Sequence, residues 1–371
     1  MIQINGKYNF ANVMIDDIDA ETRKQIQGFC NNLSFKGSYI AIMPDCHAGA
    51  GSCIGFTMQM NDRIIPDVVG VDIGCGMLSR KYKLENINLN ALDDFIKANI
   101  PSGFSINSKM ANTDTSFYKD TIKRLGIDSD RVDKSLGTLG GGNHFIELGY
   151  DENGFMWLTV HSGSRNFGLQ IAKHHGNVAK ELCTKWGADT QGIPFLIADS
   201  EEGRAYFNDA IIGARYAATN RRLMLNKIER LFLGSDAIDE IESVHNFIDE
   251  TGMIRKGATP AYYGQMVIIP FNMRDGLAIC RGKGSKKYNY SAPHGAGRIL
   301  SRSKAKASLD VEYFKQDMKD SGVYTTTADR STLDESPDAY KDKNVIIENI
   351  KETVDIISFV KPIYNFKAGG E

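Results

Sequence analysis

Three short apolar segments, each followed at once by a polar loop, constrain the fold of this chain most strongly. Such β-rich segments, bounded by turn-forming residues, predict buried strands. We therefore expect strands over residues 37–43, 67–71 and 155–160. The loops that follow them are Pro44-Asp45-Cys46-His47, Asp72-Ile73-Gly74-Cys75-Gly76 and His161-Ser162-Gly163-Ser164-Arg165. Each predicted strand thus ends in side chains that can carry chemistry.

Helical periodicity of apolar residues appears elsewhere, at about residues 170–186, 203–233 and 342–361. Strands and single helices do not alternate regularly, so the pattern favours an α+β fold over a doubly wound parallel sheet. We expect one mixed sheet with surrounding helices and an active site at the strand ends. No repeat, low-complexity segment or linker divides the chain, so residues 1–371 are predicted to form a single catalytic domain.

The charge balance limits the kind of nucleic-acid contact that is possible. The 371 residues are 42% hydrophobic and 24% charged, as in an ordinary globular protein, and their formal net charge is −2. This balance argues against a non-specific nucleic-acid binder. Any nucleic-acid contact is therefore expected at a local patch, and residues 281–309 form one in the sequence, with eight Lys and Arg and no acidic residue. A solvated basic face is the alternative interpretation of that segment.

The six cysteines are scattered without a CxxC pair, which is typical of reduced thiols. The first ten residues contain no apolar core of a secretion signal, and no apolar run is long enough to span a bilayer. We therefore expect a cytoplasmic protein with no membrane partner.

Five of the seven histidines lie in glycine-rich or polar contexts, namely His47, His144, His161, His245 and His294. A lone histidine is usually structural, but several at strand ends beside Asp72 and Cys75 favour metal binding. A thiolate, a carboxylate and imidazoles together suit Mn²⁺, Zn²⁺ or Fe²⁺, whereas Mg²⁺ prefers oxygen ligands. The other two, His174 and His175, lie in a helical pattern and are expected at the surface.

The usual phosphate-binding motifs are absent from the sequence. There is no GxxxxGK[ST], no complete GxGxxG, and no Lys-x-Asp-Gly of the lysine-dependent nucleic-acid ligases. A neutral imidazole can instead attack an α-phosphate and form a phosphoramidate. His294 suits that role, because glycine follows it and Arg298, Arg302 and Lys304 can balance phosphate charge.

Eight separated blocks of the sequence resemble the RtcB family of RNA-splicing ligases, which join RNA ends using GTP and Mn²⁺. The similarity extends from about Pro44 to Lys367. The blocks, in family order, are MPDCHAGAGSCIG, VVGVDIGCGM, LGTLGGGNHFIEL, VHSGSRNFG, SVHNF, RKGAT, HGAGRILSRSKA and AYKD.

This resemblance implies roles for individual residues. The implied ligands of a two-manganese site are Asp72, Cys75, His144, His161 and His245, with the Cys75 thiolate bridging the ions. His294 matches the histidine that becomes guanylylated. The implied GTP or GMP contacts are Asn143, Glu147 at the guanine edge, Asn272, Gly295, Ala296, Gly297, Arg298, Tyr340 and Lys367. RNA contacts are expected at Lys283, Lys286, Lys287 and Arg302.

The implied reaction joins an RNA 3′-phosphate or 2′,3′-cyclic phosphate to a 5′-hydroxyl through histidine-GMP and RNA(3′)pp(5′)G, in RNA repair or tRNA splicing. An archease-like activator is a further expected partner. Two alternatives stay open: a metal-dependent hydrolase of such RNA ends that has lost guanylylation, and an RNA-binding repair factor without activity.

The chain departs from the family pattern at two places. Where the family has Ile-Pro-Gly-Ser-Met-Gly, residues 269–276 read IPFNMRDG, and a lysine common in the family is Ala50 here. We expect Phe271 and Arg274 to change the size and charge of the nucleotide pocket, and Asn272 to replace a hydroxyl contact. These departures predict a divergent branch of the family.

Overall fold

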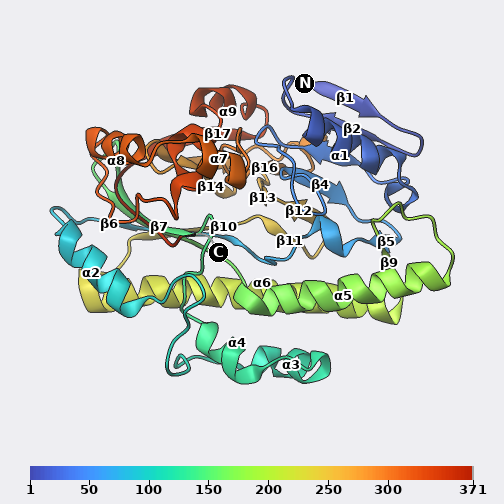
Figure 1. The fold of residues 1–371 in the computed structure, drawn as a ribbon, viewed down its shortest axis with the longest axis horizontal. Coiled ribbons are helices and arrows are strands. Elements are labelled where there is room, and N and C mark those ends of the chain that lie inside the picture. Colours follow the sequence, from blue (N-terminus) through green and yellow to red (C-terminus); the bar gives the residue numbers. More distant parts are fainter. Residues whose placement is uncertain (370–371) are drawn as a thin grey trace.

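The computed structural model describes residues 1–369, which form two large sheets rather than the single sheet expected from the sequence (Figure 1). The α+β class is confirmed, because helices and largely antiparallel strands are mixed along the chain. The larger sheet has seven antiparallel strands in the order β10 (Asp239–Val244), β6 (Gly76–Tyr82), β8 (Met156–Ser162), β7 (Phe145–Asp151), β17 (Val354–Lys367), β15 (Gly276–Gly282) and β14 (Met266–Asn272).

The second sheet has six strands and lies nearer the N-terminus. Its order is β1 (Ile2–Asn5), β2 (Phe10–Val13), β3 (Ile40–Ile42), β4 (Phe56–Gln59), β12 (Met253–Lys256) and β11 (Asn246–Ile248). Only β2 and β3 pair in parallel. Two short pairs complete the strands, β13 (Ala258–Pro260) with β16 (Ser291–Pro293) and β5 (Arg63–Ile64) with β9 (Leu196–Ile197).

Two of the three predicted strands are confirmed. Residues 37–43 contain β3, and residues 155–160 form most of β8, all seven of whose side chains are buried. The strand predicted at 67–71 is wrong. Proline at the first helical position starts a 3₁₀ turn over Pro66–Val68, and Gly70 follows in a left-handed conformation with φ of +88°. Val68 and Val69 are buried without belonging to a sheet.

The predicted helices at 170–186 and 203–233 are confirmed as α5 (Arg165–Lys185) and α6 (Glu201–Ile228), the latter followed by a π-helical turn, Glu229–Leu233. The helix predicted over 342–361 is wrong in its second half. It ends as α9 (Lys343–Asn349), and β17 begins at Val354. Pairing with β15 and β7 outweighs the local helical spacing there, because burial alternates residue by residue from Val354 to Lys361.

Helix α6 connects the two sheets. It packs on β6 and β8 of the larger sheet and on β11 of the second. Met224 and Ile228 join the core beneath β8, whereas Tyr206 and Tyr216 belong to the core of the other sheet. Figure 1 shows α5 running beside α6, while α7, α8 and α9 lie on the opposite side of the sheets. One helix can therefore position loops that leave both sheets.

The remaining helices are short. They are α1 (Ala20–Asn31), α2 (Leu89–Asn99), α3 (Lys119–Leu125), α4 (Ser129–Ser135), α7 (Arg302–Ser308) and α8 (Val311–Asp320). Among the described residues, no helix combines the length and the apolar character that crossing a bilayer requires. All six cysteines are free and buried, as expected for reduced thiols.

Candidate active site

Four neighbouring strands of the larger sheet meet at one edge and bring their terminal residues together. The strands β10 and β8 end there, while β6 and β7 begin there, because neighbours in the sheet are antiparallel. His245 follows β10, Cys75 precedes β6, His161 lies at the end of β8, and His144 precedes β7. The sheet register therefore gathers residues that are widely separated in the sequence.

The gathered side chains bring their donor atoms within 3.1–3.5 Å of one another, close enough to share a metal ion. The Cys75 Sγ lies 3.3 Å from His161 Nε2 and 3.5 Å from His144 Nε2. The Nε2 atoms of His161 and His245 are 3.2 Å apart. Asp72 Oδ2 lies 3.1 Å from His144 Nε2. All five residues predicted as metal ligands are therefore in one cluster.

This cluster consists of two groups of three donors that share one atom. The first group is Asp72, Cys75 and His144, and the second is Cys75, His161 and His245. The donor atoms within each group lie within 4.8 Å of one another. The shared atom is the Cys75 sulfur, the position that a thiolate bridging two cations would take.

Two of the three histidines are oriented for metal binding through Nε2. Nδ1 of His144 donates to the Leu139 carbonyl at 2.9 Å, and Nδ1 of His161 donates to the Asn143 carbonyl at 3.1 Å. These bonds keep the lone pair on Nε2. Burial lowers the pKa of His161 and of His245 far below the ordinary value, so both rings are neutral, as metal ligands must be.

The thiol of Cys75 also fits a metal ion. Burial, together with the charge of Asp72, raises the pKa of Cys75 well above its ordinary value. A thiolate at this position therefore needs a compensating cation. The mixed sulfur, nitrogen and oxygen donors suit a transition metal such as Mn²⁺ or Zn²⁺.

Asp72 reaches the cluster because Gly163 has no side chain. A Cβ at Gly163 would lie 2.1 Å from Asp72 Oδ1, which is closer than any contact permits. The same carboxylate oxygen accepts a hydrogen bond of 3.0 Å from the Ser164 backbone N–H. The loop that follows β8 thus holds the aspartate by its backbone.

Two adjacent residues of α6, Asn220 and Arg221, form hydrogen bonds with the loops that carry the candidate ligands. Asn220 accepts from the backbone of Gly137 and Thr138 and donates to the carbonyls of Thr138 and Gly163. Arg221, which is wholly buried, donates to the Gly74 carbonyl at 2.8 Å and to Glu242 at 2.7 Å. The loops that carry Cys75, His144 and His161 are therefore fixed to one helix.

His294 lies beside the donor cluster. Its ring centroid is 4.7 Å from that of His245. The Nδ1 of His294 donates to Asp45 Oδ2 at 2.7 Å, and the same oxygen accepts from the His294 backbone N–H at 3.2 Å. Because Asp45 engages Nδ1, the lone pair of Nε2 is left for other chemistry.

The loop that carries Asp45 is itself fixed from the C-terminal half of the chain. Lys341 Nζ donates to the carbonyls of Pro44 and Cys46 at 3.0 and 2.8 Å. Gly297 packs directly against the Asp45 backbone, where a Cβ would lie 2.1 Å from the Asp45 carbonyl oxygen. Gly297 also has φ of +74°, so glycine is required there for two reasons.

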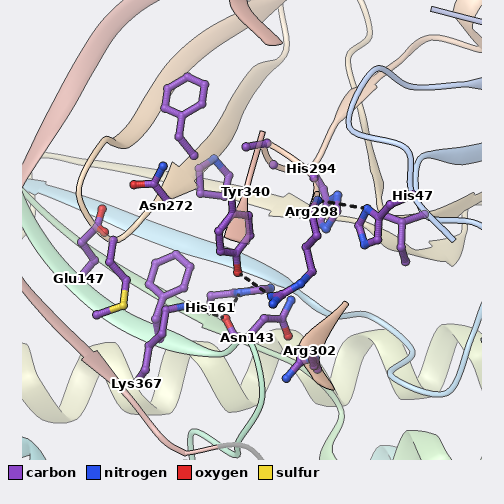
Figure 2. A pocket seen from close by; sticks show the side chains of 18 of the residues that line it. His47, Asn143, Glu147, His161, Asn272, His294, Arg298, Arg302, Tyr340 and Lys367 are labelled. Carbon is purple, nitrogen blue, oxygen red and sulfur yellow. Dashed lines mark hydrogen bonds between the residues drawn. The ribbon is translucent and has the colours of Figure 1, made fainter. Parts of the chain in front are cut away.

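A cavity of about 290 Å³ opens next to His294. Figure 2 shows that Glu147 and Asn272 lie toward one end and His47 toward the other. All the residues predicted to contact GTP line it: Asn143, Glu147, Asn272, Gly295, Ala296, Gly297, Arg298, Tyr340 and Lys367. Phe145, Phe271 and Met273 supply apolar walls. The cavity thus combines flat apolar surfaces with a few polar groups.

A buried carboxylate organises the basic residues of this cavity. Glu335 accepts from Arg298 Nη1 at 3.1 Å, from Lys367 Nζ at 2.9 Å and from the Tyr340 hydroxyl. Burial alone would raise the pKa of Glu335, but the charges of Lys367, Arg302 and Arg298 lower it to about 2. Glu335 is therefore ionised and holds the cations in place.

Glu147, unlike Glu335, is a buried carboxyl without an ion-pair partner at hydrogen-bond distance among the described residues. Its side chain is buried, Oε2 accepts from Asn365 Nδ2 at 2.9 Å, and Oε1 has no hydrogen-bond partner among residues 1–369. Burial raises the pKa of Glu147 to about 8, although the Asn365 bond and the charge of Lys367 oppose this. An unsatisfied buried oxygen lining a cavity suits a ligand that brings N–H donors.

The departures from the family pattern have unequal effects. Phe271 lines the cavity, as expected. The expectation that Arg274 changes the charge of the pocket is wrong, because Arg274 lies outside the lining and pairs with Asp317 of α8 at 3.1 Å. Asn272 lines the cavity, but its amide is used in its own turn, where it donates to Asp275 and accepts from two backbone N–H groups.

The basic residues predicted to contact RNA are partly neutralised. Lys283 pairs with Asp355 at 2.8 Å, and Lys287 pairs with Glu352 at 2.9 Å. Folding thus brings carboxylates to a segment that has none of its own. Lys286 is exposed, and Arg302 lines the cavity while pairing with Asp334 at 3.3 Å.

The expected surface position of His175 is also wrong, although His174 is exposed as expected. His175 is buried between α5 and α6, where Nε2 bonds Asp209 Oδ2 at 2.7 Å. Asp209 also accepts from Thr121 and Arg124 of α3. This buried network fastens α3 to the two long helices.

Several residues that build the site could not be assigned a role from the sequence. They are Asp45, Asn220, Arg221, Glu335 and Lys341. For Asp45 the sequence does contain an indication of a role, because this carboxylate lies at the end of a predicted strand. The others act through contacts across long sequence separations, and their local patterns resemble ordinary helix or loop surface.

A family model described as tRNA-splicing ligase RtcB matches residues 29–127 and 123–368. RNA-splicing ligase RtcB of Escherichia coli (strain K12) is 31% identical over 389 aligned residues, which cover 93% of this chain and 94% of that protein. tRNA-splicing ligase RtcB of Aeropyrum pernix is 29% identical, with 82% of each chain covered.

Proposed function

Because the chain belongs to the RtcB family of RNA ligases, we propose that it joins RNA 3′-phosphate or 2′,3′-cyclic phosphate ends to 5′-hydroxyl ends with GTP as co-substrate. RNA repair or tRNA splicing is the process it serves. The names of its relatives, RNA-splicing and tRNA-splicing ligases, support this class of substrate.

Two Mn²⁺ ions are the metals we propose. Asp72, Cys75 and His144 would hold one, and Cys75, His161 and His245 the other. Bound there, such ions supply Lewis-acid stabilisation of charge on the phosphate under attack. The neutral imidazoles and the position of the Cys75 sulfur between the two groups support this assignment.

The first proposed step is guanylylation of His294. Nε2 attacks the α-phosphorus of GTP, an N–P bond forms, and pyrophosphate leaves. Asp45 keeps the proton on Nδ1, so the lone pair of Nε2 is available. The same carboxylate stabilises the positive charge that the ring gains as the bond forms.

The cavity beside His294 is the proposed nucleotide site. Glu147 is suited to the N–H groups at the guanine edge, and Arg298 and Lys367 are suited to phosphate oxygens. The proposed nucleotide contacts are Asn143, Glu147, Asn272, Gly295, Ala296, Gly297, Arg298, Tyr340 and Lys367. Arg302 lines the same cavity and is proposed to contact the RNA.

Two transfers complete the reaction. An oxygen of the RNA 3′-phosphate attacks the phosphorus on His294, the N–P bond breaks, and RNA(3′)pp(5′)G forms. The 5′-hydroxyl oxygen of the second RNA then attacks the RNA phosphate and loses its proton, and GMP leaves. The product is a 3′–5′ phosphodiester. A 2′,3′-cyclic phosphate is first opened by water to the 3′-phosphate.

The bond between Asp45 and His294 beside the metal-ligand cluster carries this proposal. It presents one imidazole nitrogen as a nucleophile at the boundary between a nucleotide-sized cavity and the donor cluster. A binding protein would have no use for that arrangement.

Incubation of the purified protein with Mn²⁺ and α-³²P-GTP, followed by a denaturing gel, tests the proposal. We expect a labelled band that is acid-labile and base-stable, as a phosphoramidate is. His294→Ala should abolish it. His47→Ala is the matched control, because His47 lines the same cavity but directs Nδ1 to the Asp45 carbonyl. Labelling that survives in His294→Ala would place the nucleophile elsewhere.

Complete absence of labelling in the wild-type protein, with metal bound, would favour a metal-dependent hydrolase of RNA cyclic phosphate or 3′-phosphate ends. The observation that favours this second candidate is the altered segment 269–276, in which Phe271 lines the cavity and the Asn272 amide donates to Asp275 within its own turn.

A further inference from the structure

A second, larger cavity leads to the metal-ligand cluster from outside the nucleotide cavity. It has a volume of about 1110 Å³, and Asp72 lies in its lining. Arg302 lines both cavities, so the two adjoin at that residue. A molecule in the larger cavity would therefore reach the proposed reaction centre without crossing the nucleotide position.

One face of α5 forms a wall of this larger cavity, which is called the groove below. Lys173, Gly176, Asn177, Lys180 and Thr184 all line it. Their spacing of three, four, seven and eleven residues from Lys173 puts them on a single helical stripe. At about 1.5 Å per residue, the stripe is roughly 16 Å long, which suits an extended chain better than a compact small molecule.

Gly176 lies in the middle of this stripe. A glycine inside a helix costs about 0.5–1 kcal/mol relative to alanine. Close packing does not explain the glycine, because among residues 1–369, apart from the neighbouring residues of α5 itself, no heavy atom lies within 4 Å of the position a Cβ would take. A ligand backbone that approaches the helix closely would explain it.

The charges of the groove suit an anionic ligand. Lys173 and Lys180 are exposed, and neither forms an ion pair within the described part of the chain. Lys256 and Arg302 also line the groove, but the Lys256 ammonium donates to the Ala50 carbonyl and Arg302 pairs with Asp334. Lys173 and Lys180 are therefore the lining cations left for a ligand. Two carboxylates also line the groove, Asp67 and the metal-ligand candidate Asp72. Val71 is 57% exposed and offers an apolar surface close to Asp72.

We propose that the groove along α5 binds the single-stranded RNA next to the reacting end, with Lys173 and Lys180 contacting its phosphates. The inference rests on the proposed function, and it names the path of the RNA. It differs from the sequence prediction, which put the contacts at Lys283, Lys286 and Lys287. In that segment Lys283 and Lys287 are already paired with Asp355 and Glu352.

The test measures RNA affinity against salt concentration. The probe is a short, fluorescent, single-stranded RNA with phosphates at both ends, bound with Mn²⁺ and without GTP, so that no ligation occurs. Lys173→Gln/Lys180→Gln should reduce the slope of log K against log salt by about 1.4, since each lost single-strand contact removes about 0.7. Lys123→Gln/Lys185→Gln is the charge-matched control, because both lysines are exposed and lie outside the groove.

A blocking variant gives an independent measurement. Gly176→Leu places a side chain in open groove space and removes a helix-weakening residue, so it should fold at least as stably as the wild type. We expect Gly176→Leu to weaken RNA binding at least about tenfold. The salt slope of the control Lys123→Gln/Lys185→Gln should equal that of the wild type.

Two outcomes would overturn the proposal: an unchanged slope in Lys173→Gln/Lys180→Gln, or a loss of slope only in Lys283→Gln/Lys287→Gln. GMP labelling of the same proteins is measured in parallel, since that step uses no RNA. Absence of labelling in the wild type would contradict the proposed ligase chemistry, whereas the RNA affinities would still decide whether the groove binds RNA.

Discussion

Asp45 and His294 meet in a hydrogen bond of 2.7 Å between Oδ2 and Nδ1, although 249 residues separate them in the sequence. Asp45 is wholly buried, and its other oxygen has no hydrogen-bond partner within the described chain. The carboxylate therefore has one function in this structure, which is to fix the orientation and the tautomer of one imidazole.

Asp45→Asn tests that function. An asparagine amide can donate to Nδ1, which would move the ring proton to Nε2 and remove the nucleophilic lone pair. We expect the single-turnover rate of GMP labelling to fall by about 10²–10⁴-fold, with GTP affinity little changed. Labelling at the wild-type rate, in a variant that melts at the wild-type temperature, would contradict the tautomer argument.

Cys75→Ala tests the shared sulfur. Because both donor groups include Cys75, its loss should weaken Mn²⁺ binding to each group by at least about tenfold and abolish both guanylylation and ligation. Titration followed by the electron paramagnetic resonance signal of free Mn²⁺ measures this. Cys53→Ala is the control, because Cys53 is equally buried but belongs to the apolar core. Normal Mn²⁺ binding by Cys75→Ala would remove it from the ligand set.

The five residues of the donor cluster were predictable because each follows or precedes an apolar segment within a short distance. A thiol, a carboxylate and imidazoles that gather at strand ends are rarely needed for packing, so these residue types themselves indicated a metal site. Even there, the strand expected before Asp72 is a 3₁₀ turn. The loop chemistry was thus more predictable than the element that supports it.

The supporting contacts were not predictable for a physical reason. Arg221 lies in a helix whose pattern shows only which face is buried, and nothing local indicates that its guanidinium reaches the Gly74 carbonyl. The segment that becomes β17 has apolar residues at helical spacing, and only its long-range pairing with β15 and β7 makes it a strand. Both features depend on partners distant in the sequence.

Glu147→Gln should change the dependence of stability on pH. Burial raises the pKa of Glu147 to about 8 in the folded protein from an ordinary 4.5, so the folded state holds a proton that the unfolded state releases. Stability therefore falls as pH rises between these values, by at most about 1.4 kcal/mol per unit. Urea unfolding between about pH 5 and 8 should show a shallower decline for Glu147→Gln. An identical decline would assign it to another group.

The raised pKa of Glu147 also predicts how the affinity for GTP depends on pH. If the guanine N–H groups bind an ionised Glu147, complex formation releases its proton. GTP affinity should then rise with pH up to about 8, by at most tenfold per unit. Calorimetry in buffers of different ionisation enthalpy measures the released proton directly. Glu147→Gln should bind GTP more weakly and without this pH dependence, and proton release by that variant would exclude the assignment.

Asn220→Leu tests whether α6 positions the metal ligands. The substitution keeps a similar volume but leaves buried groups of Gly137, Thr138 and Gly163 without their partner. Each such group costs about 1–3 kcal/mol, so we expect a loss of about 3 kcal/mol or more in unfolding free energy. Mn²⁺ affinity should fall as well, because the loops involved adjoin His144 and His161.

A purely structural role for Asn220 is separated from a positioning role by two further variants. Thr219→Val removes a hydroxyl that donates to the Arg215 carbonyl within α6, so it reports the cost of a helix-internal bond. Asn220→Asp keeps the oxygen that accepts from Gly137 and Thr138 but loses the amide that donates to the Thr138 and Gly163 carbonyls and to the Ser162 hydroxyl. If α6 positions the site, Asn220→Asp loses Mn²⁺ affinity at a temperature where it is fully folded. Wild-type Mn²⁺ affinity in the folded Asn220→Asp protein would reduce Asn220 to a stability residue.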